Sequence, residues 1–344
     1  MSGKPKRVYA NRRNVNIGGG VKKSGLGGGI GVPTMLRRFI SRRAPDGIKS
    51  GGDSGSWILA QPMQTPRING TAAVLNNKLY VLGGLDGIDG PIAEYQTFDG
   101  NSWTSSETVS SSPVFFSCCV VYHNEIYAFT MTGEVKIFDG SSFIDGIQLP
   151  QEFANIPGLS AVVYKDEIYF IGDSNGSVFI FDGSTWRTGT SMIKPTMGAS
   201  SVVYNGKIYV MGGIDIASQS QDGASQSFIG TTDVQVFDGD SWSLGPPLNN
   251  ERVLSSAVVY NNKIYVIGGS STLGSLGYKT VEVFNGTSWV SGPSLNISRY
   301  FYTYYPACTV FNNKIYVMGG YVYIGGPPLV QGSHIPTSSV ETLS

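Results

Sequence analysis

Short apolar runs separated by turn residues recur along most of the chain. Residues 257–260 and 263–267 are largely apolar, and Asn261 and Asn262 lie between them. Asparagine tolerates the positive φ that a two-residue hairpin turn requires. A third run, residues 281–284, reaches Asn-Gly and turns into a segment that carries a Trp. The pattern predicts a four-stranded antiparallel sheet whose two tight turns lie on the same side.

This unit is repeated six times. The first motif lies at 72–84, 119–130, 161–172, 201–213, 257–269 and 308–320, and the second follows five of these at 97–103, 137–143, 180–186, 236–242 and 283–289. The tyrosines that anchor the first motif are 47, 42, 40, 56 and 51 residues apart (Tyr80, Tyr127, Tyr169, Tyr209, Tyr265 and Tyr316). Repetition at this period predicts a solenoid or a propeller.

The repeated residues resemble the kelch repeat, whose family fold is a β-propeller. The resemblance rests on Ile-Tyr-Val-x-Gly-Gly, then an aromatic residue before Asp-Gly or Asn-Gly, then a Trp, and it covers residues 53–344. Four repeats carry both glycines, at Gly83/Gly84, Gly212/Gly213, Gly268/Gly269 and Gly319/Gly320. The second and third repeats have Thr130-Met131 and Gly172-Asp173 there, and Phe143 replaces Trp in the second. Their turns still align, so we count both as blades.

The two ends of the repeat array indicate how the ring closes. Residues 338–343 match the third strand of a repeat, and no Trp segment follows them. Residues 53–63 resemble residues 238–248, which contain the fourth strand of repeat 4. We therefore expect an all-β, six-bladed kelch-type β-propeller of four-stranded antiparallel blades, in which strand 55–60 completes the last blade. Closure removes the open sheet that favours aggregation.

Charge is distributed unevenly, although the formal net charge of the chain is zero. Twelve of the 24 Lys and Arg residues, but one of the 24 Asp and Glu residues, lie within residues 1–52. This segment therefore carries +11 and residues 53–344 carry −11. Such an asymmetry usually indicates a partner, and it separates an extended basic N-terminal arm, 1–52, from the propeller, 53–344.

The arm is rich in glycine and cannot bury enough apolar surface to fold alone. Residues 34–43 predict a short helix, because Met35, Leu36, Phe39 and Ile40 share one face. A helix this short needs a docking surface in water. The basic residues that we expect to contact a partner are Arg12, Arg13, Lys22, Lys23, Arg37, Arg38, Arg42 and Arg43.

Three interpretations of the arm remain open. It binds an anionic polymer such as nucleic acid through contacts to phosphate, it docks into a neighbouring protein subunit, or it directs the chain to an organelle. We place the docking arm first, since a Gly-rich segment becomes ordered only through extensive contacts. A viral particle or another large assembly is then a reasonable setting.

The connections after the second strand and after the fourth strand of a repeat emerge on one face of the predicted ring, opposite the tight turns. We call it the long-connection face, and its longest connections span residues 85–93, 214–232, 270–279 and 321–336. Long loops on one face of a rigid scaffold commonly serve recognition.

Arginines stand near the starts of three repeats on this face and near the axis, at Arg67, Arg252 and Arg299. The resemblance implies that such arginines line a central pocket for acidic peptides. We take them, together with Tyr300, Phe301 and Tyr302, as candidate partner contacts. The alternative is that the arginines pair with acidic neighbours or carbonyls around the axis, because a charged group is rarely buried unpaired.

Enzymatic interpretations find less support. Propellers that resemble galactose oxidase hold copper with two histidines and two tyrosines, whereas the two histidines here, His123 and His334, fall on opposite faces. A metal-free site similar to that of sialic-acid mutarotases would use Arg67 with Glu251, and nothing in the sequence favours it. We expect no catalytic residue, no metal and no cofactor.

Cysteine usage and hydropathy bound the compartment. Cys118, Cys119 and Cys308 are an odd number and argue against a disulfide scaffold. No apolar run approaches the length of a membrane span, and the first residues lack the apolar core of a secretory signal. We expect an intracellular, reducing compartment or the interior of a large particle.

The sequence therefore predicts a non-enzymatic structural or protein-interaction subunit, with protein partners at the arm and at the long-connection face. A propeller enzyme acting on a carbohydrate and a nucleic-acid-associated protein that binds through the arm are the alternatives.

Overall fold

The computed structural model describes residues 55–86, 90–106, 116–151, 158–215, 228–272, 277–299, 306–324 and 333–344, with backbone alone at 323, 324, 333 and 334. The chain divides into two units, Met1–Ser50 and Gly51–Ser344, and all described residues belong to the second. The arm, its helix at 34–43 and its eight basic contact residues lie outside the described residues, as do Tyr300, Phe301 and Tyr302.

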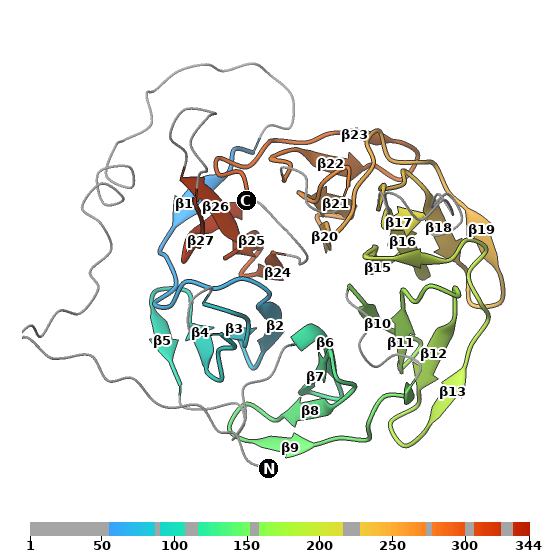
Figure 1. Cartoon of the computed structure of the whole chain (residues 1–344), viewed down its shortest axis with the longest axis horizontal. Coiled ribbons are helices and arrows are strands. Elements are labelled where there is room, and N and C mark those ends of the chain that lie inside the picture. Colours follow the sequence, from blue (N-terminus) through green and yellow to red (C-terminus); the bar gives the residue numbers. More distant parts are fainter. Residues whose placement is uncertain are drawn as a thin grey trace, which may run out of the picture. The chain divides into compact units, whose positions relative to one another are not determined.

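Six antiparallel four-stranded sheets make up the second unit, as the repeat pattern predicted (Figure 1). The first three are β2 (Thr71–Leu75), β3 (Lys78–Leu82), β4 (Tyr95–Phe98) and β5 (Trp103–Ser105); β6 (Phe116–Tyr122), β7 (Glu125–Thr130), β8 (Val135–Phe138) and β9 (Phe143–Asp145); and β10 (Ser160–Tyr164), β11 (Glu167–Ile171), β12 (Val178–Phe181) and β13 (Trp186–Thr188). The fourth and fifth are β15 (Ser200–Tyr204), β16 (Lys207–Met211), β18 (Val234–Phe237) and β19 (Trp242–Leu244); and β20 (Ser256–Tyr260), β21 (Lys263–Ile267), β22 (Val281–Phe284) and β23 (Trp289–Ser291). The sixth is β24 (Ala307–Phe311), β25 (Lys314–Met318), β28 (Val340–Leu343) and β1 (Ile58–Ala60).

The sheets are the blades of a closed ring. The first strands contact one another in the order β2, β6, β10, β15, β20 and β24, and β24 returns to β2 (Figure 1). These strands lie innermost, around the axis of the ring, and the fourth strands lie on the rim. The second and third repeats form blades despite their substitutions at the Gly-Gly positions.

The N-terminal strand closes the sixth blade. β1 pairs antiparallel with β28, with Ile58 opposite Thr342 and Ala60 opposite Val340. The strand is shorter than the predicted segment 55–60, but it supplies the missing fourth strand. The indole Nε1 of Trp57, directly before β1, donates to the carbonyl of Pro293 at 2.8 Å, which ties the sixth blade to the fifth.

The same indole bond joins other blades. Each Trp donates to a carbonyl that follows the fourth strand of the preceding blade: Trp103 to Gln61 at 2.9 Å, Trp242 to Thr190 at 2.9 Å, Trp289 to Pro246 at 2.9 Å and, at a longer 3.5 Å, Trp186 to Ile147. Apolar clusters fill the spaces between neighbouring blades. The ring is therefore held by repeated contacts at each blade junction.

The glycine pairs lie where a neighbouring blade comes closest. The Gly320 N–H of blade 6 donates to the Arg67 carbonyl of blade 1 at 2.9 Å, and the Gly213 N–H of blade 4 donates to the Arg252 carbonyl of blade 5 at 2.7 Å. A Cβ at Gly319 would collide with the same Arg67 carbonyl, and Gly319 also has a positive φ of 71°. Only glycine fits this approach without strain.

Two short antiparallel strand pairs lie in the long connections. β14 (Thr196–Met197) pairs with β17 (Ile214–Asp215), and β26 (Tyr321–Ile324) pairs with β27 (Ser333–Pro336). No helix among the described residues is long and apolar enough to span a membrane.

Candidate recognition face and axial cavity

Two hollows lie along the axis of the ring, which we together call the central channel: one with a mostly apolar lining and one with a more polar lining. The next-to-last residue of every first strand is a valine: Val74, Val121, Val163, Val203, Val259 and Val310. These valines precede the tight hairpin turns, so they form an apolar ring at the short-turn end. Val121, Val163, Val203 and Val259 line a shallow hollow at this end. All except Val121 also pack against the apolar clusters between neighbouring blades.

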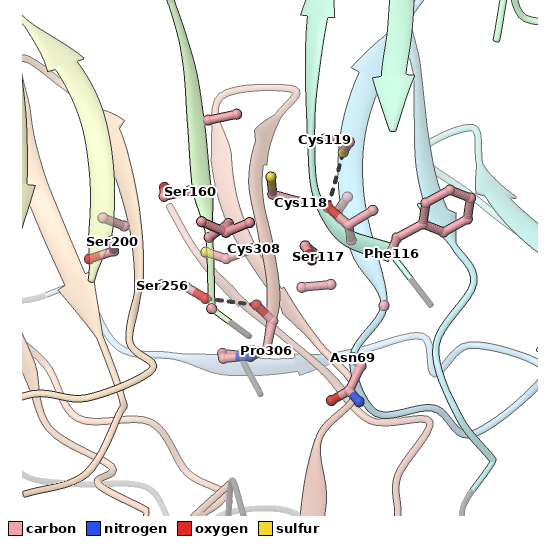
Figure 2. A pocket seen from close by; sticks show the side chains of 18 of the residues that line it. Asn69, Phe116, Ser117, Cys118, Cys119, Ser160, Ser200, Ser256, Pro306 and Cys308 are labelled. Atoms are coloured by element: carbon pink, nitrogen blue, oxygen red, sulfur yellow. Dashed lines mark hydrogen bonds between the residues drawn. The ribbon is translucent and has the colours of Figure 1, made fainter. Parts of the chain in front are cut away.

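The opposite end of the channel is hollowed into a cavity of about 150 Å³, which we call the axial cavity (Figure 2). Residues at or before the starts of the first strands of all six blades line it, so it opens toward the long-connection face. The described lining residues are uncharged, and serine hydroxyls alternate with alanine, cysteine and larger apolar side chains.

Side-chain hydrogen bonds link neighbouring blades around this cavity. The hydroxyl of Ser160 pairs with that of Ser201 at 2.6 Å, across blades 3 and 4. The Ser256 hydroxyl donates to the Pro306 carbonyl at 2.7 Å, across blades 5 and 6 (Figure 2). Between blades 4 and 5, the Ser200 and Ser255 hydroxyls are 3.2 Å apart. The polar wall is thus built and partly satisfied by the ring itself.

All three cysteines of the chain line the axial cavity as free thiols. Burial raises the pKa of Cys119 to about 12, and a hydrogen bond from the Thr71 hydroxyl lowers it in part. Burial likewise raises the pKa of Cys308 to about 12, and that of Cys118 well above its usual value. The thiols are neutral at physiological pH and act as small uncharged lining groups. The described residues contain no cluster of His, Cys, Asp and Glu that could hold a metal.

The three candidate arginines are buried inside the blades. Arg67 is 1% exposed, and Arg252 and Arg299 are each 0% exposed. Each guanidinium donates to the carbonyl of the first glycine of its own blade: Arg67 to Gly83 at 2.7 Å, Arg252 to Gly268 at 2.5 Å, and Arg299 to Gly319. None of them lines the axial cavity. The side chains are closed off from solvent in this conformation of the ring, and their role as partner contacts stays a prediction.

Each arginine is also paired with a glutamate of its own blade. The nitrogen–oxygen distances are 3.4 Å for Arg67 and Glu94, 2.9 Å for Arg252 and Glu282, and 3.3 Å for Arg299 and Glu341. Burial lowers the pKa of Arg67 to about 10, and Glu94 opposes part of this shift. Burial also lowers the pKa of Arg252 and Arg299, and their glutamates again raise it. These ion pairs are the alternative that the sequence left open.

The buried glutamates hold the connections that enter their blades. Glu282 accepts hydrogen bonds from the Asn249 N–H at 2.6 Å and the Asn250 N–H at 3.2 Å. Glu341 accepts hydrogen bonds from the Asn296 N–H at 2.6 Å and the Ile297 N–H at 3.2 Å. In blades 1 and 4, Gln96 and Gln235 each accept one backbone N–H bond in the same way. In blade 4 the Thr196 hydroxyl takes the place of the arginine and donates to the Gly212 carbonyl at 3.2 Å. These bonds attach the connections that enter the blades to side chains inside the blades.

The sequence interpretation missed these glutamates and the cavity serines. A signal for both was present, because Glu or Gln occupies the second position of the third strand in four repeats, and small polar residues begin several first strands.

The two histidines do not form a common site in the described residues. His123 lies in the hairpin turn between β6 and β7, with its Nε2 3.0 Å from Asp166 Oδ1, and both side chains are exposed. The side chain of His334 lies outside the described residues.

The long connections of blades 4 and 5 are joined to each other. Isolated β-bridges link Ile214 with Gly230, Ile229 with Thr272, and Val253 with Ser270. Ile214 and Val253 also form a small apolar cluster with Leu254. Ile229 is 49% exposed. The result is an ordered surface with an apolar side chain available for contact.

Comparisons with known proteins agree with this geometry. Residues 251–296, which contain most of blade 5, match the family described as the Kelch motif. The chain is a kelch-repeat β-propeller. A solved structure titled "Structure of YjhT" shares the propeller fold, with a TM-score of 0.63 and 15% identity over 81% of this chain and 95% of that chain.

Curated proteins with similar sequences are themselves named for kelch repeats or as scruin. Kelch-like protein 35 of Mus musculus is 26% identical over 196 residues, which are 53% of this chain and 33% of that protein. Kelch repeat protein M-T8 of Myxoma virus (strain Lausanne) is 23% identical over 237 residues, 60% of this chain and 42% of that protein. Beta-scruin of Limulus polyphemus is 26% identical over 195 residues, 50% of this chain and 21% of that protein. The kelch propeller thus spans less than half the length of each of these relatives.

Proposed function

We propose that the protein is a non-enzymatic interaction subunit that recognises a protein partner with its long-connection face. The observation that carries the proposal is the ordered junction of blades 4 and 5, which presents Ile229 on the long-connection face. Recognition surfaces combine apolar anchors with a polar surround, and loops on a rigid scaffold commonly carry them.

The chemistry of the axial cavity supports binding over catalysis. General acid–base catalysis needs a group whose pKa lies near the working pH. The titratable groups that line the cavity are thiols whose pKa is raised, two of them to about 12. The three arginines are buried and each is paired with a glutamate of its own blade. A carbohydrate-converting activity therefore remains the second candidate.

The arm completes the proposal as an anchor. Its excess of positive charge suits docking into an acidic protein neighbour in a large assembly, and binding to nucleic acid is the alternative. A salt titration of arm binding to nucleic acid tests the alternative, since phosphate contacts give a steep dependence on salt concentration, and an affinity indifferent to salt would exclude it.

Site-specific photo-crosslinking tests the recognition face. A photoreactive phenylalanine analogue is placed at Ile229 in the full chain, and the control carries it at Leu244 on the outer strand β19, which is 55% exposed. We expect defined protein adducts from position 229 in the native host cell and none of the same mass from position 244. Identical adducts from both positions, or adducts from position 244 alone, contradict the proposal.

A further inference from the structure

The axial cavity differs from the site that the family resemblance implied. The resemblance suggested arginines facing an acidic peptide. In the structure the guanidinium groups of Arg67, Arg252 and Arg299 are turned into the blades, where backbone carbonyls and glutamates engage them. The described cavity lining carries no formal charge.

A charged group placed in this cavity would lose water without gaining an opposite charge. Transfer of an unpaired carboxylate from water into a protein interior costs several kcal/mol, whereas an amide or hydroxyl needs only its hydrogen bonds replaced. The lining can replace them, because serine hydroxyls both donate and accept. Ser201 and Ser255 already bond across blade junctions and retain capacity for a second partner.

The size of the cavity limits the occupant. A cavity of about 150 Å³ accommodates a molecule of about six non-hydrogen atoms, as the binding of benzene in an engineered cavity of that volume shows. The side chain of glutamine falls within this limit. The mixed lining suits its two parts, since Ala161, Ala257 and Leu159 can contact the methylene groups while the hydroxyls bond the amide.

The geometry points to the axial cavity as a pocket for one uncharged, hydrogen-bonding side chain, of the carboxamide type, that the partner inserts from the long-connection face. This inference rests on the proposed function for the identity of the occupant as part of a protein. The charge selectivity follows from the cavity alone and can be measured without the partner.

An isosteric pair of probes tests the charge selectivity. N-acetyl-glutamine amide and N-acetyl-glutamate amide have nearly the same shape and differ in charge. The full chain is labelled with ¹³C at alanine methyl groups, and both probes are titrated at neutral pH. Ala161 and Ala257 report on the cavity, and Ala128, which is 0% exposed on β7, is the control. We expect the cavity methyl signals to shift with the glutamine probe at a concentration about tenfold or more below that needed for the glutamate probe.

Two variants make the result specific to the cavity. Ala161→Leu fills the space and is expected to abolish the shifts at Ala257. Ala257→Lys places a cation in the cavity and is expected to reverse the preference toward glutamate, as followed at Ala161. Unchanged alanine signals outside the cavity show that each variant is folded.

Several results would overturn the inference. Equal or stronger binding of the glutamate probe by the unmodified chain contradicts it, and so does the absence of any shift at Ala161 and Ala257 at the solubility limit of the glutamine probe. Shifts with glucose but not with the glutamine probe would assign the cavity to a carbohydrate. If crosslinking from position 229 succeeds while the probes fail, the pocket assignment is wrong and the recognition face stands. If the probes bind and no adduct forms, the pocket assignment stands and the recognition face proposed at position 229 is wrong.

Discussion

The Nε of Arg252 lies 2.9 Å from Oε1 of Glu282, and the two side chains are 0% and 2% exposed. The same guanidinium donates to the carbonyls of Gly268 and Thr280, and the same carboxylate holds the connection that enters blade 5. One buried pair therefore joins the Gly-Gly segment, the third strand and the incoming connection.

Removal of one partner from this pair should be strongly destabilising. We expect Arg252→Met to lower the free energy of unfolding by about 3–5 kcal/mol, because Glu282 is left buried without its countercharge. Urea denaturation followed by tryptophan fluorescence measures the change. Arg187→Met is the control, since the pair of Arg187 with Glu167 is partly exposed and should contribute about 1 kcal/mol or less. Equal losses in the two variants would show that the buried pair has no special role.

Substitutions of Trp57, directly before the closing strand β1, should lower the free energy of unfolding by different amounts. We expect Trp57→Ala to cost about 3–5 kcal/mol of unfolding free energy through the cavity it leaves at the junction of blades 5 and 6. Trp57→Phe retains an aromatic ring, as Phe143 does in blade 2, and should cost about 1–2 kcal/mol through loss of the bond to Pro293. Thermal unfolding by circular dichroism ranks the variants. A neutral Trp57→Ala would mean that the ring does not depend on its N-terminal strand.

The turns between the third and fourth strands should make a contribution to stability that is lost at acidic pH. In four turns an aspartate accepts two backbone N–H bonds, and these bonds lower the pKa of Asp99, Asp139, Asp182 and Asp238, that of Asp139 to about 2. A lowered folded-state pKa stabilises the fold above the unfolded-state pKa, and this contribution is lost as pH falls toward the folded-state value. We therefore expect the wild type to lose stability progressively between about pH 5 and pH 2 through these four groups.

Asparagine at the same four positions should remove this part of the acid dependence. Asn285 occupies the equivalent position in blade 5 and accepts the same two bonds through its amide oxygen at 2.9 Å each. The fourfold Asp→Asn variant should keep its turns at neutral pH and show a flatter dependence of the urea midpoint on pH. Parallel profiles for the variant and the wild type would refute the assignment.

The cavity thiols should be slow to react in the folded protein. At pH 8 a thiol with a pKa near 12 is far less ionised than an ordinary cysteine, and its more basic thiolate offsets only part of this, so disulfide-exchange labelling should be slower by about tenfold or more. Labelling with an aromatic disulfide reagent, before and after unfolding in urea, measures this. Rapid labelling of all three cysteines in the native state would contradict the environment described for them.

Local patterns were enough to predict the ring, because each blade repeats the same hairpin and turn residues. Closure by the N-terminal strand was also predictable, since the array lacks one Trp strand at the end and has a spare one at the start. The burial and ion pairing of the three arginines could not be predicted, because Glu94, Glu282 and Glu341 lie 27, 30 and 42 residues from their partners. Sequence spacing placed the arginines near the axis, but their rotation into the blades depends on these distant carboxylates.

The axial cavity escaped prediction for a similar reason. Each blade contributes only a few small residues to it, such as Ser160, Ser201 and Ser256, and none of them forms a motif alone. Their convergence is a property of the closed ring. The valine ring at the other end is visible in the sequence as the recurring valine before each hairpin tyrosine or its equivalent, but its role as a channel wall requires the blade order.

Hydroxyl-radical footprinting of the native assembly against the purified chain tests the central claim, that recognition occurs on the long-connection face, most directly. Ile229 and Met131 report on that face and the axial cavity, and Val121 and Ile144 report on the short-turn end and the rim. We predict lower oxidation of Ile229 and Met131 in the assembly, with Val121 and Ile144 unchanged. Protection confined to Val121 and Ile144 would place the partner elsewhere and contradict the account.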